Sequence, residues 1–212
     1  MYASVLEYIR QNADEYAMSV LQHIRLSAAV VALAFLIGFP LGFVCSRSAR
    51  ANRILTEFFG LLRIVPSLAL LVVCIPVLGV GVLPAAAALT VLAVPPILIN
   101  TAAGFASVPG PVRETAAGMG MSPFMAFRRV ELPLAAPMTL TGVRTATVEV
   151  IASATLAAYI GGGGLGTIIF TGLGLYRTDM LVVGGGSVAL LSLLADLLFF
   201  LAERTATRYR RA

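Results

Sequence analysis

The chain has 212 residues, of which 59% are hydrophobic and only 12% are charged, whereas an ordinary soluble domain is about 45–50% apolar and about 25% charged. Apolar surface in this excess needs the bilayer as its solvent, so the composition excludes a soluble domain and predicts a polytopic membrane protein. All 15 basic residues are arginine, and without the lysine of a Walker A loop the chain cannot carry an ordinary P-loop ATPase site. The net charge of +5 comes from arginines that flank apolar spans and act on topology, so nucleic-acid binding is not expected.

The first residues, from Tyr2 to about Ser19, are expected to form a short helix along the membrane surface. Glu7, Asp14 and Glu15 stand where a signal peptide has its basic head and apolar core, so no cleaved leader is expected. We therefore divide the chain into an N-terminal surface segment (residues 1–20), a transmembrane domain (residues 21–203) and a basic cytoplasmic tail (residues 204–212).

Five stretches are long and apolar enough to cross a bilayer, which takes roughly 20 residues per helix. They run from about Ile24 to Val44, Ile54 to Leu78, Pro84 to Ala106, Pro137 to Ile160 and Met180 to Leu201. An odd number places the two termini on opposite sides of the membrane.

Arginine placement indicates which side is which, because basic residues are retained on the cytoplasmic face. With the N-terminus outside, the cytoplasmic segments hold Arg47, Arg50, Arg53, Arg113, Arg128, Arg129, Arg204, Arg208, Arg210 and Arg211, and only Arg10, Arg25 and Arg177 remain outside. The sequence therefore predicts an external N-terminus and a cytoplasmic C-terminus.

A glycine run follows the fourth span. Gly161, Gly163 and Gly166 have the G-x-G-x-x-G spacing of a dinucleotide-binding loop, but that motif requires a preceding strand and a βαβ unit, and the chain predicts neither. We expect the glycines to permit close helix packing or a broken turn that lines a cavity. A flexible outer loop with no specific task is the alternative.

The longest cytoplasmic segment, Gly110 to Pro137, is too polar to span a membrane and too patterned for a slack loop; we call it the coupling segment. It resembles the E-A-A-x3-G-x9-I-x-L-P signature of the permease subunits of bacterial ABC importers. Glu114, Ala116, Gly120, Leu132 and Pro133 match outright, Ala117 follows the matched alanine, and Thr115 and Val130 replace an alanine and an isoleucine.

The resemblance extends over nearly all of the chain from about Leu21 to Glu203. The stretches RIVPSLALL (from Arg63), RTATVEVIASATLAAYIGGGGLG (from Arg144) and FTGLGLYRTD (from Phe170) are similar to permeases that import osmoprotectants such as glycine betaine, carnitine and choline. The resemblance implies an all-α, five-helix type I importer bundle with an N-terminal surface helix and a cytoplasmic coupling helix.

The same resemblance implies the partners. They are a second permease subunit, identical or related, two cytoplasmic ATPase subunits that bind ATP and Mg²⁺, and a separate extracytoplasmic substrate-binding protein, all at the bacterial inner membrane and its lipid. No cofactor is expected on this chain.

In the importer family the coupling segment forms a short helix that docks onto the ATPase. Small side chains at Ala116, Ala117 and Gly120 suit close approach to a partner, and Glu114 near a helix start suits the helix dipole. Arg113, Arg128 and Arg129 can pair with acidic partner residues. The alternative is an amphipathic loop with only a topological role.

Polar residues within the spans are candidates for the translocation pathway, because unpaired polar groups are costly in a bilayer. Glu149 could face the pathway, or it could pair with Arg144 or with a polar group on a neighbouring helix. Ser153, Thr155 and Tyr159 follow it at about one-turn spacing and could share its face, which would line a pathway or a helix interface. Pro66 and Ser67 are further candidates, since prolines kink helices in gated pathways.

Arg63 and Asp196, also within spans, are expected to be packing or ion-pair partners.

No catalytic or metal site is expected. His23 is the only histidine, Cys45 and Cys74 are expected to be packed thiols, and no triad accompanies them. Three alternatives stay open: the same importer with another solute, such as an amino acid or a betaine-like thiol-histidine derivative; an ATP-independent channel or secondary transporter; and an intramembrane enzyme.

Overall fold

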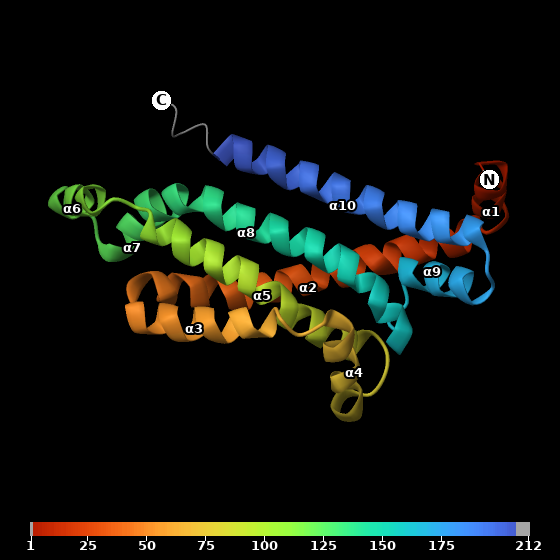
Figure 1. Ribbon diagram of the computed structural model, residues 1–212. Coiled ribbons are helices and arrows are strands. Elements are labelled where there is room, and N and C mark those ends of the chain that lie inside the picture. The colour runs from red at the N-terminus through yellow and green to blue at the C-terminus, as the bar shows by residue number, and fades with distance from the viewer. Residues whose placement is uncertain (1, 207–212) are drawn as a thin grey trace.

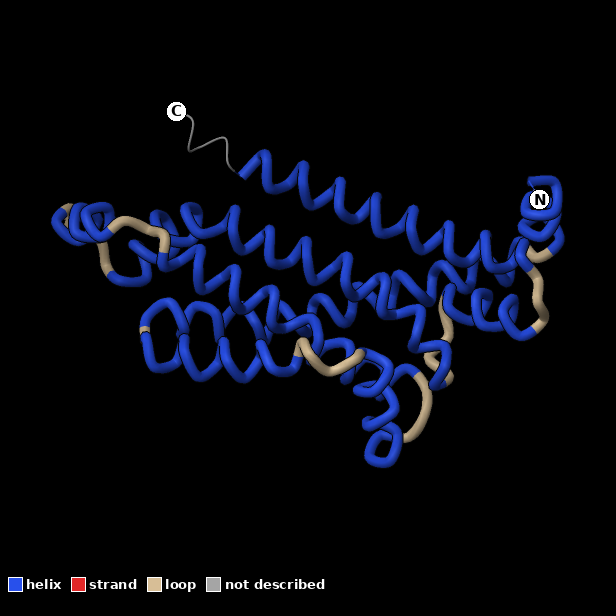
Figure 2. Tube along the Cα trace, in the orientation of Figure 1, coloured by secondary structure: helices blue, strands red, loops and turns tan. Residues whose placement is uncertain are grey.

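The computed structural model describes residues 2–206, and within this range every regular element is a helix, as Figure 2 shows. The elements are α1 (Tyr2–Gln11), α2 (Ala13–Arg47), α3 (Ala49–Leu62), α4 (Ser67–Leu78), α5 (Val82–Ala106), α6 (Gly110–Gly118), α7 (Pro123–Ala126), a π-turn (Phe127–Glu131), α8 (Leu132–Ser153), a 3₁₀ helix (Ala154–Ile160), α9 (Leu165–Gly174) and α10 (Thr178–Ala206). The all-α prediction is confirmed for these residues. Arg208, Arg210 and Arg211 of the basic tail lie outside them.

The long helices run side by side, with α1 at one end of the bundle and α6 and α7 at the other (Figure 1). Helices α2, α5 and α10, and the continuous helical stretch Pro123–Ile160, are each long and apolar enough to cross a membrane. A fifth span exists only if α3 and α4 are counted together. Four of the five predicted spans are therefore present as long apolar helices, and the predicted second span corresponds to the bent pair α3–α4.

The second span departs from the continuous helix expected from Ile54 to Leu78. It breaks after α3, and α4 turns away by 93°, so that α4 projects away from the long helices in Figure 1. Pro66 explains the break, because proline lacks an N–H donor and disfavours a helical conformation in the residue before it. The turn between the two helices brings Arg63 within reach of Glu149 on α8.

The N-terminal helix is shorter than predicted. Helix α1 ends at Gln11, and Asn12 leaves the helical conformation with φ −121° and ψ 34° while its side chain donates a hydrogen bond to the Tyr8 carbonyl oxygen, 3.0 Å away. Residues 13–19 belong instead to α2, which begins at Ala13 rather than near Ile24.

The core forms where α5 packs between α2 and α8, and glycine lets these helices approach closely. A Cβ atom on Gly42 of α2 would come within 2.6 Å of the Leu98 carbonyl oxygen of α5, and one on Gly142 of α8 within 2.7 Å of the Pro96 carbonyl oxygen. Membrane helices associate through such small-residue contacts, because the bilayer supplies no hydrophobic drive between them. Helix α10 packs against α8 and α9 at the side of this core.

The glycine run makes a close-packed corner at the end of the bundle where α1 lies. Gly161, Gly163 and Gly164 have positive φ angles, and the Gly164 N–H donates to the Gln22 Oε1 atom of α2 at 3.2 Å. The neighbouring His23 is buried and its Nε2 lies 3.0 Å from the Ile151 carbonyl oxygen at the end of α8. The close packing expected of these glycines is present, and a short helix that the sequence analysis did not predict, α9, follows them.

Candidate functional site

A cavity of about 320 Å³ lies where α3 breaks, between that turn, α5 and α8. Four of the predicted pathway residues share it: Pro66 and Ser67 at the start of α4, and Glu149 and Ser153 on α8. The apolar part of the lining includes Ile64, Val65, Leu89, Leu92, Ala93 and Val150. The cavity depends on the α3–α4 bend, because a straight second span would not bring the Arg63–Pro66 turn to it.

Arg63 and Glu149 form an ion pair inside this cavity. The Arg63 Nη2 atom lies 3.1 Å from Glu149 Oε1, and the two side chains are 46% and 42% exposed. The sequence left Arg144 or a polar group on a neighbouring helix as possible partners of Glu149. The observed partner is Arg63, on a neighbouring helical segment. The expectation that Arg63 is an ion-pair partner is confirmed.

Arg144 is held elsewhere, on the side of α8 that faces α10. Its Nε and Nη2 atoms lie 2.5 and 2.7 Å from the two Asp196 carboxylate oxygens, and its Nη1 lies 3.7 Å from Glu203 Oε2. The Arg144 guanidinium also lies over the Phe200 ring, 5.3 Å from its centroid. The expectation that Asp196 is an ion-pair partner is confirmed.

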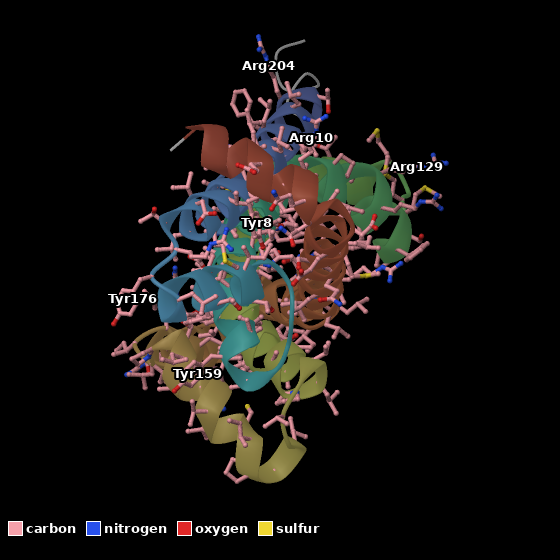
Figure 3. All side chains as sticks on the ribbon, turned by 90° about the vertical axis from the view of Figure 1, so that its right-hand side faces the viewer. Tyr8, Arg10, Arg129, Tyr159, Tyr176 and Arg204 are labelled. Carbon is pink, nitrogen blue, oxygen red and sulfur yellow. The ribbon has the colours of Figure 1, made fainter. Side chains whose placement is uncertain are left out.

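Thr155 and Tyr159 do not line the cavity. The Thr155 hydroxyl donates to the Ala152 carbonyl oxygen, and Tyr159 is 65% exposed with its ring 6.0 Å from that of Phe170. Figure 3, which views the bundle from the α1 end, shows Tyr159 at its periphery. Sequence spacing failed here because α8 becomes a 3₁₀ helix after Ser153, and its three residues per turn change which side chains share a face.

The coupling segment projects from the opposite end of the bundle (Figure 1). It forms two short helices, α6 and α7, where a single helix was expected. Its exposed members among the predicted residues are Glu114, Thr115, Ala117, Gly120, Arg128, Arg129 and Pro133, whereas Val130 and Leu132 are half-buried. Apolar side chains are exposed here as well, with Met119 at 65% and Phe124 at 71%.

Three side chains of this segment differ from what the sequence predicts. Ala116 is 1% exposed, so its small side chain serves packing within the chain and not contact with a partner. Arg113 is also committed internally: its Nη2 donates to the Phe105 carbonyl oxygen at 2.6 Å. Glu114 lies in the middle of α6, which has no acidic residue in its first turn, so it does not meet the helix dipole there.

A glycine is required at position 120 because of the backbone conformation there, not because of close packing. Its φ is +75°, and nothing lies within 4 Å of a Cβ built on it. The residue therefore makes the turn between α6 and α7, a left-handed conformation that glycine adopts without steric cost.

Glu131, which was not predicted from the sequence, ties the coupling segment to the transmembrane helices. Its side chain is 8% exposed and pairs with Arg113 of α6 (Nε–Oε1 3.3 Å) and with Arg47 at the end of α2. The Phe105 and Phe127 rings stack beside this network with centroids 5.7 Å apart. A signal was available, since a carboxylate within an otherwise apolar V-E-L-P stretch needs a partner if it is buried.

Within residues 2–206 there is no group of three or more His, Cys, Asp or Glu side chains that could hold a metal ion. Cys45 is buried and Cys74 is half-buried, and both are free thiols.

Comparison with known proteins identifies the family. Residues 34–208 match the family described as the binding-protein-dependent transport system inner membrane component, and the chain belongs to it. It is thus a multi-pass inner-membrane permease subunit of an ABC importer, a class in which ATP hydrolysis takes place on a separate chain and which works with ATPase and substrate-binding partners.

Several curated relatives are osmoprotectant permeases. The chain is 39% identical over 203 residues to the choline transport system permease protein OpuBB of Bacillus subtilis, covering 96% of this chain and 94% of the relative. It is 36% identical over 203 residues, with the same coverage, to the glycine betaine/carnitine/choline transport system permease protein OpuCB of that organism. It is 38% identical to the carnitine transport permease protein OpuCB of Listeria monocytogenes, covering 91% of this chain and 88% of the relative.

Solved structures share the fold. A chain of the MetNI methionine ABC transporter in an inward-facing conformation superposes with a TM-score of 0.78 at 22% identity, covering 92% of this chain and 97% of that one. The predicted type I importer bundle is therefore confirmed.

Proposed function

We propose that this chain forms, together with a second permease subunit, the translocation pathway for a quaternary-amine compatible solute such as glycine betaine, carnitine or choline. The proposal for the solute rests on the relatives, which are permeases of choline, carnitine and glycine betaine systems over nearly the whole length of the chain. One structural observation supports the proposed site: a half-exposed Arg–Glu pair in a cavity at the break of the second span.

Pro66, Ser67, Glu149 and Ser153 are the proposed pathway residues, because they line the same cavity. Charged groups at membrane depth are costly unless they are paired or face water, and they commonly mark a solute route. Thr155 and Tyr159 do not line this cavity and are not part of the proposed site.

At the other end, the proposed ATPase-docking surface consists of Glu114, Thr115, Ala117, Gly120, Arg128 and Arg129 with the exposed apolar side chains of Met119 and Phe124. Ala116, Val130, Leu132 and Pro133 are proposed to shape this surface. Two cytoplasmic ATPase subunits that bind ATP and Mg²⁺, and a separate extracytoplasmic substrate-binding protein, complete the proposed complex. The N-terminus is proposed to lie outside and the C-terminus inside.

The test is ATP-driven uptake of radiolabelled solutes into proteoliposomes that contain the complex purified from native membranes with its binding protein. Uptake of glycine betaine, carnitine or choline is expected. Uptake of an amino acid or a betaine-like thiol-histidine derivative, with none of the quaternary amines, would keep the importer and replace the solute.

A further inference from the structure

The Arg63–Glu149 pair differs from the other interhelical ion pair of α8 in how it is held. One hydrogen bond joins Arg63 to Glu149, whereas Arg144 donates hydrogen bonds to both Asp196 oxygens and stacks on Phe200. A guanidinium has five N–H donors and a carboxylate about four acceptor sites. A single bond therefore leaves most of the bonding capacity of Arg63 and Glu149 available.

Both groups are also accessible from the cavity that they line. The Arg63 and Glu149 side chains are 46% and 42% exposed, while Arg144 is 28% exposed and lies outside this lining. A solute in the cavity can thus reach a cationic donor and an anionic acceptor at the same time.

The rest of the lining indicates how a quaternary ammonium group would be recognised. Proteins often bind such groups in cages of aromatic rings, but the lining residues named for this cavity include no Phe, Tyr or Trp. The Glu149 carboxylate is the only anionic group among them. An ammonium group in this cavity would be attracted by charge, not by an aromatic surface.

We propose that Arg63 and Glu149 form an exchangeable ion pair that selects zwitterionic solutes over simple cations. When a zwitterion enters, its carboxylate binds Arg63 and its ammonium group faces Glu149, so one ion pair is replaced by two and every charge stays compensated. A cation without a carboxylate would meet Glu149 and leave Arg63 unpaired at membrane depth, which is unfavourable. This inference rests on the proposed function, since it concerns how the proposed pathway discriminates among quaternary amines.

The test compares uptake of glycine betaine, a zwitterion, with uptake of choline, a cation, in proteoliposomes of the whole complex with saturating binding protein. Arg63→Gln leaves Glu149 unpaired and should shift the betaine-to-choline uptake ratio towards choline by about tenfold, equivalent to about 1.4 kcal/mol. Glu149→Gln leaves Arg63 unpaired and should shift the ratio in the opposite direction. Misfolding lowers uptake of both solutes together, so it cannot move the two ratios in opposite directions.

Two controls accompany these variants. Arg63→Lys preserves the charge and should shift the ratio less than Arg63→Gln does, in the same direction. Arg177→Gln removes an exposed arginine that pairs with Asp179 outside the cavity, and it should leave the ratio unchanged.

Equal ratios in wild type, R63Q and E149Q would overturn the inference while leaving the proposed function intact. Wild-type uptake of glycine betaine alone, with no gain of choline uptake in R63Q, would also overturn it. If the wild-type complex takes up none of glycine betaine, carnitine and choline, the proposed function fails, and the inference fails with it.

Discussion

Arg144 of α8 and Asp196 of α10 form a two-pronged ion pair, with N–O distances of 2.5 and 2.7 Å. Because α10 packs on the side of the core, this pair is a main polar contact that fixes it to α8. Asp196→Asn removes the negative charge and one of the two acceptor oxygens that Arg144 contacts, and it should lower the melting temperature of the purified complex by several degrees. Size-exclusion chromatography after heating gives the fraction of complex that remains monodisperse at each temperature, and hence the melting temperature.

The matched control for Asp196→Asn is Arg53→Gln. Arg53 pairs with Glu57 on one exposed face of α3, with side chains 81% and 67% exposed, and such surface pairs contribute little. No change is expected for R53Q. An equal loss in both variants would show that the α8–α10 pair has no special structural role.

Close helix approach gives a second prediction. Gly42→Ala would place a Cβ 2.6 Å from the Leu98 carbonyl oxygen and 2.7 Å from Thr101 Cβ, so α2 and α5 would have to separate. Overpacking of this kind typically costs about 1–3 kcal/mol. Gly60→Ala on α3 meets nothing within 4 Å and should be neutral or slightly stabilising, since alanine favours helix. The measurement is the melting temperature of each variant. Equal melting temperatures for G42A and G60A would contradict the close packing of α2 against α5.

A third prediction concerns the turn of the coupling segment. Gly120→Val forces a branched side chain to a φ of +75°, which costs roughly 1–2 kcal/mol or displaces α7 relative to α6. Uptake should be lost while ATP hydrolysis by the assembled complex persists, which is the signature of uncoupling. Gly118→Ala, where φ is not positive and a Cβ would meet nothing within 4 Å, should retain uptake. Full uptake in G120V would count against the assignment of the coupling segment.

The proposed topology gives a fourth prediction. Tyr176, between α9 and α10, is 94% exposed, and Phe124 on α7 is 71% exposed, so a cysteine at either position should react readily in a background lacking Cys45 and Cys74. A membrane-impermeant maleimide applied to intact cells should label Tyr176→Cys and should label Phe124→Cys only after permeabilisation. The reverse pattern would invert the topology.

Composition and patterning were sufficient to predict the all-α class and the four long apolar helices, because apolar length is a property of each segment alone. The bend of the second span was signalled by Pro66, but its 93° angle depends on what α4 packs against. The partner of Glu149 could not be predicted either, because it also depends on this bend. Arg63 reaches it only through that bend, whereas Arg144, the nearer candidate in sequence, points towards α10.

In the coupling segment, too, the local pattern was predictable from the sequence and the long-range contacts were not. Its motif was visible in the sequence, including the glycine that makes the α6–α7 turn. The burial of Ala116 and the network of Arg47, Arg113 and Glu131 depend on how α6 packs against the Phe127–Glu131 segment, whose Glu131 pairs with Arg47 at the end of α2. Those contacts join residues far apart in the chain, and no local pattern specifies them.

The most direct test of the account is ATP hydrolysis by the complex purified from native membranes and reconstituted with its binding protein, measured with and without glycine betaine. We expect an ATPase subunit to co-purify with this chain and its activity to rise when the solute is added. Purified material that contains no ATPase would contradict the claim that the chain is the pathway of an ATP-driven importer.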